Sequence, residues 1–71
     1  MVIDMKMTYD EDADAAYIYL KKKIGKGEVK KTISLNENII LDFDKNEKLI
    51  GIEILNASNV ISKKIISKQL A

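Results

Sequence analysis

The stretch from residue 38 to residue 58, NIILDFDKNEKLIGIEILNAS, limits the fold more than any other part of the chain. Two short runs rich in isoleucine and leucine enclose the polar residues DKNEK, and Asn56 and Ser58 follow. Aliphatic and β-branched runs of this length favour strands, whereas Asn and Ser are favourable N-cap residues. The stretch therefore predicts a β-hairpin that leads directly into a helix.

The same stretch also resembles a calcium-binding loop. Acidic and amide side chains fall at positions one, three, five and twelve of the EF-hand pattern: Asp42, Asp44, Asn46 and Glu53. However, Glu47 stands where the loop requires glycine, and strand-like runs replace the two flanking helices. In a hairpin, Asp42 and Glu53 lie on opposite strands and out of register. We therefore expect no metal site and no cofactor.

Two registers fit the turn of this hairpin, between Asp44 and Glu47. A two-residue loop at residues 45–46 competes with a three-residue loop that ends at Glu47. The three-residue loop pairs Phe43 with Leu49 and requires Glu47 to be left-handed, which costs about 1 kcal/mol relative to glycine. The sequence does not choose between them.

The remaining sequence predicts a small α+β fold with one domain, residues 1–71. Short runs with alternating polarity indicate strands near residues 5–9, 15–21, 29–35, 39–43 and 49–55. In the second run, Ala16 and Ile18 share one face, and Tyr17 and Tyr19 share the other. Because the connections look too short for parallel crossovers, we expect an antiparallel β-meander of four to five strands with one C-terminal helix.

The C-terminal helix is expected to begin near Asn56 and continue to the end of the chain. At 100° per residue, its apolar side chains cover about half of the circumference: Ile61, Ile65, Ile66 and Leu70. Val60 falls outside this stripe. A stripe of this width exceeds what one small sheet requires, so it indicates a further apolar surface such as a partner subunit.

Chain length and composition favour self-association. A chain of 71 residues buries only about 60% of its unfolded surface. It contains no cysteine for a disulfide and no histidine or cysteine for a zinc site. We therefore expect a homodimer. No apolar run approaches the ~20 residues of a membrane span, and Asp4 interrupts any signal sequence, so we also expect a cytoplasmic protein without membrane contact.

The side-chain chemistry argues against an enzyme. Without histidine and cysteine, the common general base and thiol nucleophile are missing, and we expect no catalytic, cofactor-binding or metal-binding residue. The alternative function is binding of single-stranded nucleic acid. Tyr17 and Tyr19 would stack on bases, and the lysine cluster of residues 21–31, from Lys21 to Lys31, would contact the phosphates. The absence of arginine and the net charge of +1 disfavour this function.

Two blocks of the sequence resemble a known family. Residues 9–20, YDEDADAAYIYL, and residues 41–58, LDFDKNEKLIGIEILNAS, are similar to the two signature blocks of domain of unknown function 2283 (DUF2283). Ala16, Glu47 and Asn56 depart from the usual leucine, glycine and aspartate of that family. The resemblance implies a compact sheet with a C-terminal helix, an antitoxin-like role beside a small toxin, and no catalytic residue. Together with the composition, it predicts a protein-interaction module.

Overall fold

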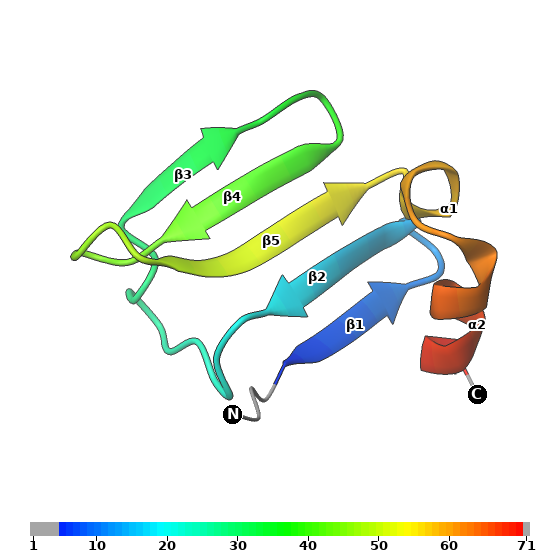
Figure 1. The fold of residues 1–71 in the computed structure, drawn as a ribbon, viewed down its shortest axis with the longest axis horizontal. Coiled ribbons are helices and arrows are strands. Elements are labelled where there is room, and N and C mark those ends of the chain that lie inside the picture. The colour runs from blue at the N-terminus through cyan, green and yellow to red at the C-terminus, as the bar shows by residue number, and fades with distance from the viewer. Residues whose placement is uncertain (1–4, 71) are drawn as a thin grey trace.

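The computed structural model describes residues 5–70 and the side chains of residues 5–68. Its elements are β1 (Lys6–Asp10), β2 (Ala15–Tyr19), β3 (Lys31–Ser34), β4 (Ile39–Phe43), β5 (Leu49–Leu55), α1 (Ala57–Val60) and α2 (Lys63–Leu70). The strands form one sheet in the order β1-β2-β5-β4-β3, and all neighbours are antiparallel (Figure 1). The predicted α+β class, with an antiparallel sheet and a C-terminal helix, is confirmed.

The strand order departs from a strict meander. After β2 the chain crosses to the far edge of the sheet, forms β3 and β4, and returns so that β5 lies between β2 and β4. The eleven residues from 20 to 30 make this crossing, and the distance from β2 to β3 is only three strand spacings, or about 14 Å. The central strand β5 is the longest and most buried strand, whereas the edge strand β3 is exposed along its whole length.

The β4–β5 turn is the three-residue loop, with Phe43 opposite Leu49. The Glu47 N–H donates to the Asp44 carbonyl at 3.0 Å, and Glu47 is left-handed with φ 60°. The Asp44 carboxylate accepts the N–H groups of Asn46 and Lys48, which holds the pKa of this carboxyl below its usual value. The sequence did not reveal the β-bulge that follows, which brings Leu49 and Ile50 to the same face.

The register gives the sheet one apolar face and one polar face. On the apolar face, two cross-strand rows run from β1 towards β3: Met7, Ile18, Ile52, Leu41 and Ile33, and Tyr9, Ala16, Ile54 and Ile39. The polar face carries Tyr17, Tyr19, Thr32, Asp42 and Glu53 beside Gly51. The predicted separation of Tyr17 and Tyr19 from Ala16 and Ile18 is thereby confirmed.

The C-terminal segment contains two short helices instead of one continuous helix. Ile61 is extended at the end of α1, and α2 restarts after Ser62, whose hydroxyl accepts the Ile65 N–H at 3.4 Å. Asn56 lies at the predicted N-cap position, but it is left-handed and its side chain makes no cap hydrogen bond. The prediction that Asn56 and Ser58 cap the helix themselves was wrong, because a carboxylate from the β1–β2 turn performs this role.

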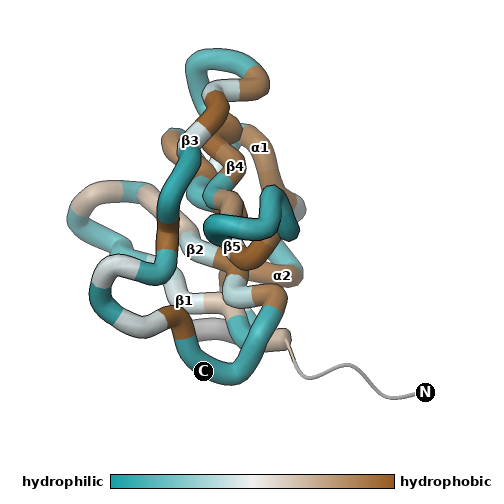
Figure 2. Tube along the Cα trace, turned by 90° about the vertical axis from the view of Figure 1, so that its left-hand side faces the viewer, coloured by the Kyte–Doolittle hydropathy of each residue, from teal (hydrophilic) through white to brown (hydrophobic). Residues whose placement is uncertain are grey.

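The hydrophobic core lies where the helices cover the apolar face. Ala16, Ile54, Ala57 and Ile66 are buried together, with Met7, Tyr9, Ile18, Ile52 and Ile61 packed around them. α2 contacts β1, and α1 contacts β5. Figure 2 looks onto the opposite end of the sheet, where the β4–β5 turn is hydrophilic. Over the described residues, no helix has the length and apolar character needed to cross a membrane.

Candidate interaction surface

Over the described residues, half of the apolar face has no helix over it. We call this region the open apolar patch. It lies on β3 and the residue after it, on β4 and at the start of β5, and it consists of Ile33, Leu35, Ile39, Leu41, Phe43 and Leu49. Ile33 lies opposite Leu41, and Phe43 lies opposite Leu49, so the side chains form one continuous surface. Ile33 is 41% exposed, Leu35 64% and Leu49 37%. Contiguous exposed apolar side chains of this kind mark interaction surfaces.

The patch is open because both helices lie at the other side of the sheet. α1 follows directly from the end of β5, and α2 then turns towards β1, away from β3 and β4 (Figure 1). The predicted apolar stripe of the helix is divided accordingly. Ile66 is buried and Ile61 half-buried against the sheet, whereas Ile65 is 45% exposed. The side chain of Leu70 lies outside the described residues.

Asp14 fastens the helices to the sheet. It is left-handed in the β1–β2 turn, with φ 49°. Its carboxylate accepts the Ser58 N–H at 3.0 Å, the Ser58 hydroxyl at 2.7 Å and the Tyr9 hydroxyl at 2.7 Å. Its carbonyl accepts the Ala57 N–H at 2.9 Å. The hydrogen bonds from Ser58 and then Tyr9 lower the pKa of Asp14, and the bond to Asp14 raises the pKa of Tyr9.

A hydrogen-bonded chain on the polar face joins the two halves of the sheet. The Tyr17 hydroxyl on β2 donates to Asp42 on β4 at 2.7 Å, and the Thr32 hydroxyl on β3 donates to the same carboxylate at 2.9 Å. The Tyr17 ring crosses β5 over Gly51, where any Cβ would overlap the phenol. Burial, together with the bond to Asp42, raises the pKa of Tyr17. This network fixes β3 and β4 without a helix over them.

The residues proposed for nucleic-acid stacking are engaged with other side chains. The Tyr17 and Tyr19 rings meet edge to face with centroids 4.8 Å apart, and the Lys6 ammonium lies 4.5 Å from the Tyr19 centroid. Asp42 and Glu53 add negative charge to the same face. The lysine cluster of residues 21–31 lies mainly in the β2–β3 connection, at one end of the strands.

The calcium pattern is dispersed by the fold. Asp42 is bonded to Tyr17 and Thr32, Asp44 is bonded within the turn, and Glu53 lies opposite Ile40. Over the part of the chain that the structure describes, no three carboxylates gather in a way that could hold a metal ion. These residues serve the sheet and its turn.

One shallow pocket of about 440 Å³ lies between the β2–β3 connection and the β4–β5 turn. Its lining residues are Gly27, Glu28, Lys30, Asp44, Lys45 and Asn46. Glu28 is paired with Lys21 and accepts the Gly25 N–H at 2.8 Å, which lowers the pKa of Glu28. Because two carboxylates and two lysines share this pocket, it favours neither anions nor cations. The open apolar patch is the stronger candidate.

The family assignment rests on the same elements. Residues 6–58 match the family described as Protein of unknown function (DUF2283). The chain belongs to the DUF2283 family. It is also 41% identical over 58 residues to Uncharacterized protein MJ0789 of Methanocaldococcus jannaschii, an alignment that covers 82% of this chain and 46% of that protein. The chain thus spans about half the length of this relative. No solved structure matches the chain.

The DUF2283 match begins at the first residue of β1 and ends at Ser58, which holds Asp14. It includes the complete sheet, the Asp14 contacts and the Tyr17 network, whereas α2 follows it. The two signature blocks of DUF2283 meet in space, because Asp14 of the first block accepts hydrogen bonds from Ser58 of the second. Neither block taken alone indicates the Asp14–Ser58 contact, because its two residues are 44 positions apart in the sequence.

Proposed function

We propose that this DUF2283 protein is a protein-interaction module that self-associates through the open apolar patch. The observation that carries this proposal is the exposure of Ile33, Leu35 and Leu49 on the one half of the apolar face that the helices leave uncovered. A second copy would bring an identical apolar surface to it. In a symmetric dimer, one patch of this kind is sufficient for both partners.

The size of the core supports the same proposal. Among the described residues, five apolar side chains are buried: Ala16, Ile50, Ile54, Ala57 and Ile66. Two of them are alanines, although 46% of the chain is hydrophobic. Small domains without a disulfide or a structural metal commonly gain the missing burial by oligomerisation. Self-association through the patch would cover a large part of the remaining apolar surface.

Analytical ultracentrifugation across the micromolar range tests this proposal. We expect the mass to rise with concentration from the 8.0 kDa monomer to twice that value. A charge placed inside the interface is costly to bury, so Ile33→Glu should keep the protein monomeric over the same range. A wild-type protein that remains monomeric throughout would refute self-association.

The matched control is Ser34→Glu. Ser34 is the next residue of β3, is also exposed, and points to the polar face because side chains alternate along a strand. It receives the same charge in the same edge strand, so it should dimerise like the wild type. If Ser34→Glu loses the dimer as completely as Ile33→Glu, then a negative charge on β3 controls association, and the apolar patch does not. Circular dichroism should confirm that both variants are folded.

An antitoxin-like role would require a heterologous partner in addition to the second copy. The patch would then be the docking site for that partner, and Ile33→Glu would abolish both interactions. Co-expression with the product of an adjacent gene, followed by co-purification with wild type, Ile33→Glu and Ser34→Glu, tests this role. We expect the wild type and Ser34→Glu to retain the product of the adjacent gene and Ile33→Glu to lose it. A wild type that does not retain the product would contradict the antitoxin-like role.

A further inference from the structure

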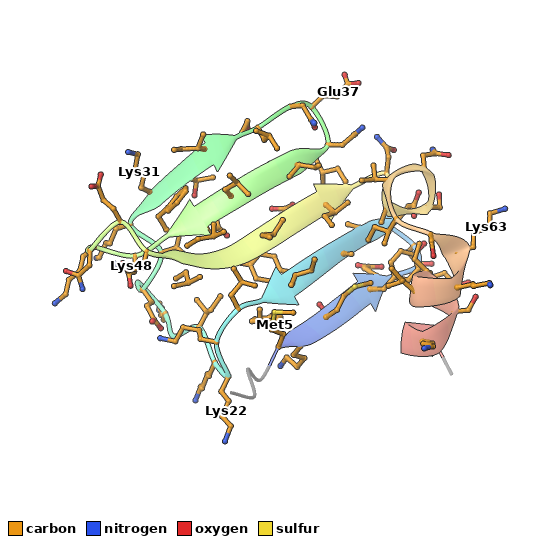
Figure 3. All side chains as sticks on the ribbon, viewed as in Figure 1. Met5, Lys22, Lys31, Glu37, Lys48 and Lys63 are labelled. Carbon is orange, nitrogen blue, oxygen red and sulfur yellow. The ribbon has the colours of Figure 1, made fainter. Side chains whose placement is uncertain are left out.

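The two ends of the sheet carry opposite charges. The β2–β3 connection, the first residue of β3 and the β4–β5 turn lie at one end, because all strands are antiparallel. This lysine-rich end holds eight lysines and three carboxylates within residues 21–31 and 44–48. Figure 3 shows Lys22, Lys31 and Lys48 there. Two of the lysines, Lys21 and Lys31, are paired with Glu28 and Glu47.

The opposite end is acidic. It contains the β1–β2 turn and the β3–β4 turn, with Asp10, Glu11, Asp12, Asp14 and Glu37. Lys63, Lys64 and Lys68 of α2 reduce this charge without cancelling it. Glu37 and Lys63 are seen at this end in Figure 3. A net charge of +1 thus conceals a separation of charge along the strands.

Resting on the proposed function, we infer that the partner on the open apolar patch is a second copy with its strands reversed, so that the lysine-rich end of each copy lies over the acidic end of the other. The two-fold axis then lies between the two sheets and runs across the strands. This rotation exchanges the ends of every strand but leaves β3 and β4 above β3 and β4 of the other copy. Patch therefore meets patch while opposite charges meet.

The alternative two-fold axis, along the strands, could also set β3 and β4 of one copy over β4 and β3 of the other. However, it keeps the direction of the strands, so it would bring the two lysine-rich ends together. Like charges in contact disfavour the wrong orientation, whereas complementary charges favour the correct one.

Exchange of charges between the two ends tests this orientation. Lys22 and Lys23 at one end, and Glu11 and Asp12 at the other, are exposed, and their side chains make no hydrogen bond or salt bridge with another described residue. We expect the double variants Lys22→Glu/Lys23→Glu and Glu11→Lys/Asp12→Lys each to dimerise roughly tenfold more weakly than the wild type. An equimolar mixture of the two should regain much of the wild-type affinity as a heterodimer, because both pairs of facing ends then carry opposite charges.

The mixture distinguishes this inference from the proposed function. If wild type dimerises and Ile33→Glu does not, but neither charge variant weakens the dimer, the orientation is wrong and the patch is still the interface. The orientation is also refuted if both charge variants dimerise more weakly than the wild type and their mixture does not regain affinity. Increasing salt should loosen both the wild-type dimer and the heterodimer of the mixture, because opposite charges face each other in both. RNA that binds the wild type and Glu11→Lys/Asp12→Lys, but not Lys22→Glu/Lys23→Glu, would assign the lysine-rich end to nucleic acid instead.

Discussion

The covered half and the open half of the apolar face are built from the same kinds of side chain but reach stability in different ways. Around Ala16 and Ile54, the helices remove apolar surface from water, and Asp14 holds them in place. Around Ile33 and Leu41, no helix is present, and the strands are fixed by the Tyr17–Asp42–Thr32 chain on the opposite face. The polar network keeps the open half ordered while its apolar side chains stay available for a partner.

Truncation of one isoleucine in each half should give the largest contrast. Ile54 is 7% exposed in the covered half, so Ile54→Ala should lower the free energy of unfolding by about 2–5 kcal/mol. Ile33→Ala in the open half should cost less than about 1 kcal/mol when measured on the monomer. Urea unfolding at protein concentrations below the dimerisation range measures both losses in the free energy of unfolding. Equal losses would show that the two halves are packed alike.

Replacement of Asp14 by Asn should weaken the covered half specifically. The amide keeps the shape and tolerates the left-handed backbone, but it loses the charge that accepts from Tyr9 and Ser58. We expect α1 and α2 to detach first, with increased amide hydrogen exchange at residues 57–68 and little change in β3 and β4. Asp12→Asn, in the same turn, is the control. A uniform increase in amide hydrogen exchange over the whole sheet would mean that Asp14 does not act through the helices.

The same residue predicts a pH dependence. Hydrogen bonds lower the folded pKa of Asp14 below its ordinary value of 3.8. Its contribution to stability is therefore complete above the unfolded pKa and is lost as pH falls through the lower folded pKa. Urea midpoints of wild type should decline over this acidic range, and those of Asp14→Asn should decline less. If the urea midpoints of wild type and Asp14→Asn decline in parallel as the pH falls, Asp14 is not the source of the pH dependence.

Gly51→Ala tests how the polar face connects the halves. A methyl group on Gly51 overlaps the Tyr17 phenol, so we expect a loss of about 1–3 kcal/mol. The loss should become smaller in a Tyr17→Ala background, where the methyl group has room. A double-mutant cycle from thermal unfolding gives the coupling. Strict additivity would mean that the ring does not cross Gly51 in solution.

Glu47→Gly should produce the smallest effect, a gain of stability. The left-handed backbone of Glu47 favours glycine by about 1 kcal/mol, although the exposed pair with Lys31 is lost. Glu47→Ala removes the same ion pair and keeps the strain, so it is the matched control. We expect the melting temperature of Glu47→Gly to exceed that of Glu47→Ala. The reverse order would indicate another conformation of the turn.

Much of the local structure could be predicted from residue patterns. Alternation located the strands and their faces, and the turn chemistry of Asp44 and Glu47 restricted the hairpin to two registers, one of which is present. Strand order was less accessible, because the length of the connection 20–30 permits a crossover but does not impose it. The helix cap was missed because the capping carboxylate belongs to a turn 44 residues earlier.

The sequence by itself determined the class of fold, the family, the polarity of each strand face and the absence of histidine and cysteine chemistry. These properties depend on neighbouring residues and on composition. Only the tertiary structure decided that β5 lies in the centre, that Asp14 holds Ser58, that Tyr17 reaches Asp42 across Gly51, and that one half of the apolar face stays open. Each of these depends on which distant segments become neighbours, because apolar burial depends on the packing of the whole chain and not on any one stretch.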